Sequence, residues 1–283
     1  MSEDITGVER LFIEQQSPEL VRARRRRRQR RRIWHSSLPL ITFASIILVW
    51  GLFVELRNVP SYVMPAPLDV FPRIWESRSR LTRESWVTLQ EILGGFGISI
   101  VTAIPLGLLL ALSETAKRAL YPAIVFVQLI PKIAVAPLFL VWFGFGLESK
   151  IFLVVLLTYF PLLIASITGF SILDQRQLYL TRSMGASTWQ TFRYLRLPSA
   201  MPVIFSGLKT SATIAATGAI VAEFVGANQG LGYYLLQGTS LLDTEIIFAI
   251  IFVLTIIGVG LNYLVEFVEY LVTPWQRRSR QER

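Results

Sequence analysis

The sequence predicts an all-α polytopic membrane protein with six transmembrane helices, and three observations support this fold class. Hydrophobic residues fill 53% of the 283 positions and the mean hydropathy is +0.51, so the chain has too little polar material to cover a soluble globule of its size. Several uncharged runs approach the roughly 20 helical residues that a hydrocarbon core requires. The runs lack the alternation of a transmembrane barrel, so the spans are expected to be helices.

The expected spans follow one another along the chain, and charged or turn-forming segments separate them. Lys132 interrupts the third, and Lys209 lies near the start of the fifth. We expect an Arg-rich segment at 1–36, a six-helix membrane domain at 37–271 with a large internal loop at 174–201, and a basic tail at 272–283. The spans are Ser37–Val54, Ile92–Leu112, Ala119–Leu147, Ile151–Leu173, Leu197–Ala222 and Ile246–Val265.

The formal net charge of +9 is concentrated near the start of the chain. Nine arginines lie at positions 22, 24–28 and 30–32, and without them the rest of the chain is neutral. A basic arm for RNA or DNA is one interpretation of this run. The interpretation we adopt is a cytoplasmic anchor ahead of the first span, which resists translocation and is attracted to anionic lipid, with no nucleic-acid partner.

The distribution of Lys and Arg predicts the orientation. With a cytoplasmic N-terminus, 21 of these residues lie on the inside and six on the outside, which favours cytoplasmic placement of both termini. The first outer loop is the weak spot, because it holds five arginines. Its stretch Arg73–Glu91 mixes acids and bases and places Trp75 and Trp86 on one helical face, which is typical of an interfacial helix.

Several kinds of chemistry are excluded by the residues themselves. The chain has no cysteine and a single histidine, His35, which excludes thiolate and multi-histidine metal sites. It has no phosphate-binding G-x-x-x-x-G-K-[ST] loop, no H-E-x-x-H and no G-x-S-x-G elbow. We therefore expect no enzyme activity, no metal and no cofactor in this chain, and any energy must come from a partner.

The internal loop contains the stretch "TRSMGASTWQTFRYLRLP", residues 181–198. Residues 175–184 are expected to be helical until Gly185 breaks the helix, and Ser187 or Thr188 can cap a second short helix before Pro198 starts the next span. Trp189, Phe192 and Leu195 form an apolar stripe on that second helix. The stripe either packs on the protein's own spans or lipid, or enters a groove on a separate cytoplasmic subunit.

The spacing from Gly185 through Leu195 to Leu197 and Pro198 resembles the signature loop of ATP-binding-cassette importer permeases. "IPKIAVAPLFLVWFGFG" at 130–146 and "AEFVGANQGLGYYL" at 222–235 are similar to permeases of nitrate, sulfonate and taurine importers and of thiamine-precursor pyrimidines. The resemblance covers roughly residues 60–272. It departs from the family at 179–181, where Tyr-Leu-Thr replaces the usual Glu-Ala-Ala and puts the usual carboxylate contact to the ATPase in doubt.

This resemblance implies a type I importer permease fold and a set of partners. The implied assembly is a homodimer of six-span subunits in the inner membrane, with two ATPase subunits that bind ATP-Mg and an extracytoplasmic solute-binding protein. The loop is implied to couple the ATPase to the pore. The residues implied in coupling are Tyr179, Thr181, Gly185, Ala186, Ser187, Trp189, Phe192, Leu195, Leu197 and Pro198.

Three residues are candidates for the translocation pathway. Lys132 lies near the middle of the third span, where a charge usually faces a cavity or a partner, and a structural hydrogen bond is its alternative role. Pro137 is expected to kink a helix that lines the path, or simply to serve packing. Glu223 ends the fifth span near the outer surface, where solvent alone can accommodate it.

The function that these features imply is import of a small solute, driven by a separate ATPase. The expected solute is an anion such as a sulfonate, taurine or nitrate, and a thiamine-precursor pyrimidine or a riboflavin-like compound is the alternative. A non-transporting membrane scaffold and a secondary transporter are rivals from other classes. The scaffold leaves the glycine-to-proline spacing unexplained, and a secondary transporter is expected to have more intramembrane polar groups.

Overall fold

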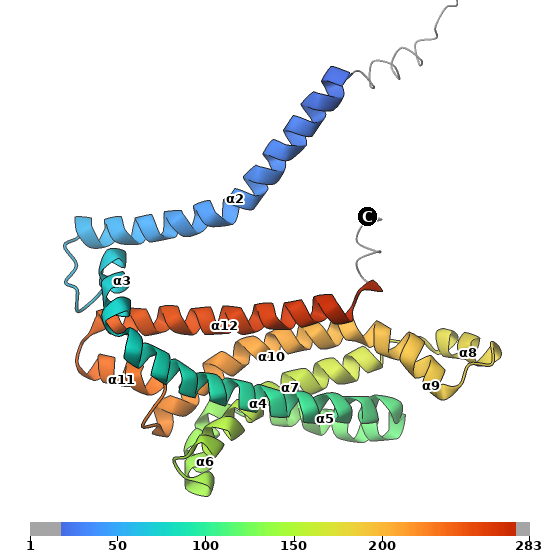
Figure 1. Ribbon diagram of the computed structural model, residues 1–283. Helices are drawn as coiled ribbons and strands as arrows, with labels where there is room; N and C mark the ends of the chain where they lie inside the picture. The colour runs from blue at the N-terminus through green and yellow to red at the C-terminus, as the bar shows by residue number, and fades with distance from the viewer. Residues whose placement is uncertain (1–17, 276–283) are drawn as a thin grey trace, which may run out of the picture. The chain divides into compact units, whose positions relative to one another are not determined.

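The computed structural model describes residues 18–275, and the side chains from residue 37 onward except that of Gln175. Every regular element in these residues is helical, which confirms the all-α class (Figure 1). The chain divides into two compact units, residues 1–69 and 70–283.

The first unit contains one long helix, α2 (Pro18–Leu56). This helix carries the arginine run and the first span without interruption, although Pro39 lies within it. The side chains of the arginine run lie outside the described residues. A helix that enters the apolar segment directly from the basic segment keeps the charges next to the end of the span.

The second unit holds the remaining spans. In the described part of the chain, five helices are long and apolar enough to cross a membrane, and a bent pair makes a sixth, in agreement with the expected six spans. The elements are α3 (Pro67–Glu76), α4 (Arg78–Leu112), α5 (Glu114–Leu129), the 3₁₀ helix η1 (Lys132–Val135), α6 (Ala136–Phe143), α7 (Leu147–Phe170), α8 (Gln175–Ser183), α9 (Thr188–Thr191), the π-helix η2 (Phe192–Arg196), α10 (Leu197–Gly226), α11 (Leu231–Ser240) and α12 (Thr244–Val272).

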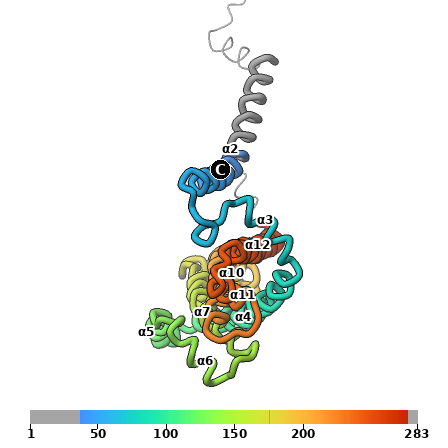
Figure 2. Tube along the Cα trace, turned by 90° about the vertical axis from the view of Figure 1, so that its left-hand side faces the viewer, coloured from blue at the N-terminus to red at the C-terminus, as the bar shows by residue number. Residues whose placement is uncertain are grey.

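The core of this unit is built around α7, which packs against both α4 and α10, and the three helices lie together in Figure 2. Small residues allow this close approach: a Cβ added at Gly95 would overlap Val154, and one at Gly207 would overlap Ala165. Such small-residue contacts are typical of helix pairs in membranes, where van der Waals packing rather than the hydrophobic effect holds helices together.

Buried hydroxyl groups join the same three helices. The Ser99 and Thr158 hydroxyls lie 2.7 Å apart, and the Ser211 hydroxyl donates to the Thr158 carbonyl at 3.0 Å. In hydrocarbon these groups have no water to bond, so pairing across the helices satisfies them and specifies the register of α4, α7 and α10.

The stretch Arg73–Glu91, which the sequence predicts as an interfacial helix, is not one separate helix. Most of this stretch is the first part of α4, which continues into the second span, and only its start belongs to α3. Trp75 and Trp86 are exposed as expected, but Glu84 and Glu91 are buried against the protein. Glu84 therefore serves a tertiary contact, which the mixed charge pattern did not reveal.

The third span is broken. α5 ends at Leu129, and the helical segment from Lys132 to Phe143 leaves it at an angle of 77°. Pro131 lies at the break and removes a backbone donor there, which accounts for the end of the α-helical ladder. Lys132 thus lies at an irregular point in the membrane-spanning region, where backbone polar groups are also exposed.

Candidate functional site

The corner in the loop between α7 and α10 is a well-defined helix stop. Gly185 has φ +77°, and its N–H donates to the Arg182 carbonyl at 2.9 Å while the Ala186 N–H donates to the Thr181 carbonyl at 3.0 Å. These two bonds make a Schellman motif, which requires the left-handed backbone that glycine adopts without strain. The sequence prediction of a helix, a glycine corner and a second helix is confirmed.

A capping box starts the second helix of the loop. The Ser187 hydroxyl accepts from the Gln190 N–H at 3.2 Å, and the Gln190 side-chain oxygen accepts from the Ser187 N–H at 2.8 Å. These reciprocal bonds satisfy the free donors at the start of α9. Both sides of Gly185 are therefore fixed by local hydrogen bonds, and the corner is rigid rather than a loose connection.

The loop exposes a set of large apolar and aromatic side chains, which we call the loop patch. Trp189 is 66% exposed and Met184 is 77% exposed, and neither is part of the buried core. An exposed group of this kind marks an interaction surface. The loop patch consists of Tyr179, Leu180, Met184, Trp189 and Tyr194.

The expected stripe of Trp189, Phe192 and Leu195 is only partly free. Phe192 packs beside the buried core, with its ring 6.5 Å from that of Phe170 and 5.6 Å from that of Trp189. Leu195 is half-buried. The π-helical turn η2 changes the helical phase after α9, so the i, i+3, i+6 spacing does not keep these three side chains on one open face.

The other expected coupling residues form the base of the loop. Leu197 and Pro198 are half-buried at the first turn of α10, where proline lacks only an N–H that the helix does not use. Because α10 begins immediately after η2, one continuous helical stretch joins the loop to the buried core.

The two candidates at the broken span lie at its bend. Lys132 is half-buried; its ammonium donates to the Gln128 carbonyl at 2.6 Å and lies 5.5 Å from the centre of the Phe160 ring. Pro137 occupies the first turn of α6, where it is compatible with the helix and does not kink it. The ammonium thus has one hydrogen-bond acceptor, a backbone carbonyl at the end of α5 just before the break.

Glu223 is fully buried, so the expectation that solvent accommodates it is wrong. Its carboxyl group accepts from the Thr88 hydroxyl at 2.6 Å and from the Gly232 N–H at the start of α11. A Cβ at Gly230 or Gly232 would collide with this carboxyl group, which explains the two glycines in "NQGLGYYL". The residue holds α11 against α4 and α10.

Glu84 of α4 also belongs to this cluster, and Thr88 makes a second hydrogen bond in it. The Glu84 carboxyl group accepts from the Gly230 N–H at 2.8 Å, and the Thr88 hydroxyl accepts from the Leu231 N–H at 2.9 Å. Carboxyl groups at a helix N-terminus satisfy free N–H donors and complement the helix dipole. Sequence reasoning missed both residues. The sequence could have pointed to them, because they lie four positions apart just before the second expected span, and this spacing puts both on one helical face.

A cluster of polar side chains joins α3 and α4 to the α11–α12 turn. Arg73 forms an ion pair with Asp243, which also caps α12 by accepting from the Ile246 N–H at 3.1 Å. The hydrogen bond to Asp243 raises the pKa of Arg73.

The Arg80 guanidinium donates a hydrogen bond to the Gln237 side chain and lies 3.9 Å from the centre of the Tyr234 ring. Arg73, Arg80 and Arg83 thus pair with acidic or amide side chains of the folded unit.

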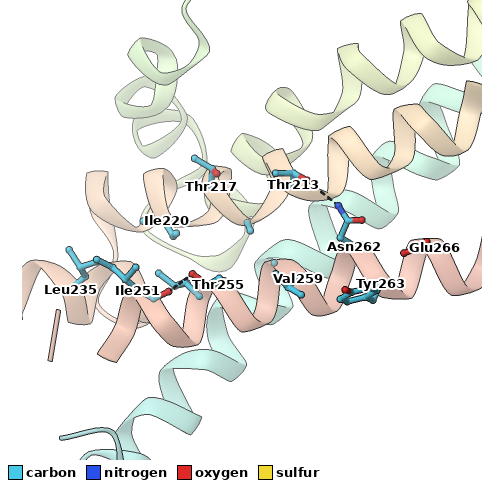
Figure 3. Close-up of a pocket in the computed structure, with 13 residues that line it drawn as sticks. Thr213, Thr217, Ile220, Leu235, Ile251, Thr255, Val259, Asn262, Tyr263 and Glu266 are labelled. Carbon is cyan, nitrogen blue, oxygen red and sulfur yellow. Dashed lines mark hydrogen bonds between the residues drawn. The ribbon is translucent and has the colours of Figure 1, made fainter. Parts of the chain in front are cut away.

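A groove of about 690 Å³ lies between α10, α11 and α12 (Figure 3). Its lining includes Thr213 and Thr217 from α10 and Thr255, Asn262 and Glu266 from α12, and the Asn262 amide donates to the Thr213 hydroxyl at 3.4 Å. Polar side chains on a membrane-spanning surface are costly in hydrocarbon. Sequence reasoning overlooked this groove, although the α12 residues recur at helical spacing.

Comparison with known proteins identifies the family. Residues 103–278 match the family described as the binding-protein-dependent transport system inner membrane component. The formylaminopyrimidine transport permease ThiX of Halalkalibacterium halodurans is 33% identical, over 88% of this chain and 100% of the relative. The taurine transport permease TauC of Escherichia coli is 27% identical, over 84% of this chain and 90% of the relative.

A solved structure supports the same fold. The inward-facing MetNI methionine ABC transporter matches with a TM-score of 0.58 at 20% identity, over 72% of this chain and 97% of that chain. The helices of this chain are therefore arranged as in that transporter chain. The chain belongs to the family of inner-membrane permease components of binding-protein-dependent ABC importers.

Proposed function

We propose that this permease pairs with a second copy of itself, with two ATPase subunits and with an extracytoplasmic binding protein to import a small organic solute. ATP-Mg belongs to the ATPase subunits, since the sequence contains no phosphate-binding loop. Both termini are cytoplasmic in this proposal, which the excess of Lys and Arg in the inside segments supports.

The observation that carries the proposal is the rigid corner at Gly185 with its exposed loop patch. The Schellman motif and the capping box prevent the corner from absorbing a push, and α10 continues from it for 30 residues beside α7 and α12. ATPase subunits that close on the loop patch would therefore shift α10 as a rigid body and change which side of the pathway is open.

We assign the pathway to the surface at the broken third span. Lys132 and Pro137 lie at or next to the bend, where freed backbone groups and an ammonium can contact a passing solute. Glu223 has a different role in this proposal: it secures α11, because it is 0% exposed and accepts hydrogen bonds from Thr88 and Gly232.

Two solute classes are supported by different observations. The greater identity to a formylaminopyrimidine permease than to a taurine permease favours a neutral or weakly charged heterocycle. The ammonium of Lys132 favours an anion such as taurine or another sulfonate. Solute-stimulated ATP hydrolysis by the complete complex, measured with a formylaminopyrimidine and with taurine, distinguishes the two classes.

The test of coupling is the substitution Gly185→Val in the reconstituted complex. A β-branched residue at φ +77° strains the corner, so we expect ATP hydrolysis without solute uptake, or weak binding of the ATPase. Gly260→Val is the matched control, because Gly260 has no positive φ and no neighbouring atoms within 4 Å of an added Cβ. Normal uptake by Gly185→Val at equal expression would show that this loop does not transmit the ATPase movement.

A further inference from the structure

A small cavity lies within the loop, between the end of α4, α8 and the α9–η2 turn. It measures about 110 Å³. Two arginines, Arg182 and Arg196, line it together with Thr188 and Thr191, and the remaining lining is mostly apolar. The cavity therefore combines two cations and two hydroxyl groups in a small, partly enclosed space.

The arginines of this cavity have no acidic partner in the described residues. Neither Arg182 nor Arg196 forms an ion pair there, and the Nη1 atom of Arg196 is buried without a hydrogen-bond partner. A buried guanidinium N–H without a protein acceptor is costly. From Lys150 to Ala222 the only acidic residue is Asp174, and its side chain caps α8 by accepting from the Arg176 N–H.

The size and charge of the cavity define its occupant. Pockets for whole small molecules usually measure 300–1,000 Å³, so a cavity of about 110 Å³ suits a single anionic group. A guanidinium binds a carboxylate through two parallel hydrogen bonds, and threonine hydroxyls can add further donors. A carboxylate at the end of an Asp or Glu side chain meets both requirements.

We propose that Arg182 and Arg196 receive a carboxylate side chain of the ATPase subunit when that subunit covers the loop patch. This inference rests on the proposed function, in which the same loop is the docking surface. The cavity and the loop patch share the short helix α9, where Thr188 and Thr191 of the cavity lie on either side of Trp189 in the sequence. Apolar contact around a buried charge pair would give the interface both affinity and a defined register.

The first test measures binding of the ATPase subunit to the permease in phosphatidylcholine nanodiscs over a range of salt concentrations. Arg196→Met should weaken binding about tenfold or more, as expected for a lost hydrogen bond between charged groups, and should reduce the salt dependence. Arg193→Met is the matched control, because Arg193 is exposed and does not line the cavity. Equal affinity for the two variants would overturn the proposal.

The second test identifies the carboxylate. The amine introduced by Arg196→Lys can be joined by a carbodiimide to a carboxylate in direct contact, and mass spectrometry of the complex should find an Asp or Glu of the ATPase subunit. Arg193→Lys should give no such product. A bond to Asp174, a bond to phosphatidylserine when that lipid is added, or no bond at all would contradict the assignment.

The two proposals fail in different ways. If Gly185→Val uncouples transport while Arg196→Met binds the ATPase as well as Arg193→Met does, the loop couples the subunits but the cavity holds no partner carboxylate. If wild-type permease binds no ATPase subunit and Gly185→Val leaves uptake unchanged, the proposed function fails together with the inference.

Discussion

Thr88→Val tests whether the buried cluster at the start of α11 holds this part of the permease together. The hydroxyl of Thr88 has two tertiary partners: it donates to Glu223 at 2.6 Å and accepts from the Leu231 N–H at 2.9 Å. Valine has nearly the same shape and helix propensity as threonine, so the substitution removes these bonds without creating a cavity.

The expected loss of stability follows from the two groups left behind. The Leu231 N–H and one Glu223 oxygen become buried without a partner, and each costs about 1–3 kcal/mol, so the central value for the two together is roughly 4 kcal/mol. For a chain of this size each kcal/mol shifts the melting temperature by about 2–4 °C, which predicts a decrease of roughly 8–16 °C. Tryptophan fluorescence during heating in detergent measures this shift.

Two control variants separate the hydroxyl from other effects. Thr88→Ser keeps the hydroxyl and should lose at most about 1 kcal/mol for the missing methyl group. Thr255→Val removes an exposed hydroxyl that bonds only the Ile251 carbonyl of its own helix, and it should melt like wild type. If Thr88→Val also melts like wild type, the cluster does not stabilise α11 and the role assigned to Glu223 is wrong.

Two other predictions concern charged side chains of the spans. Lys132→Met should lower solute uptake without changing the affinity of the separate binding protein for the solute. Lys132→Arg should retain more uptake than Lys132→Met if the charge matters. Equal uptake for Lys132→Met and wild type would show that Lys132 has only a structural role, through its hydrogen bond to Gln128. Lys209 pairs with Glu269 at 2.5 Å and joins α10 to α12, but both side chains are partly exposed, so Lys209→Met should cost less than about 1 kcal/mol. A thermal double-mutant cycle with Glu269→Gln measures that pair, and a coupling energy of zero would show that it contributes nothing.

The sequence by itself determined the features that depend on local composition. Six apolar runs predicted the spans, because each must be long enough and apolar enough to cross the membrane wherever its neighbours lie. Gly185 and Ser187 predicted the corner, because backbone conformation and capping involve residues only a few positions apart. Lys132 also marked the interruption in the third span, although the 77° bend was not predictable from it.

Only the tertiary structure decided which polar groups meet. Glu223 ends an apolar run, so its position in the sequence predicted that it faces solvent. In the structure α4 and α11 enclose it, and it accepts hydrogen bonds from Thr88, 135 positions before it, and from Gly232, nine positions after it. Phe192 lies beside Trp189 as the local periodicity predicts, but its ring is also covered by the core, since Phe170 lies beside it. Burial and hydrogen bonding depend on contacts between distant segments, and a pattern along one helix carries no information about the helix that will cover it.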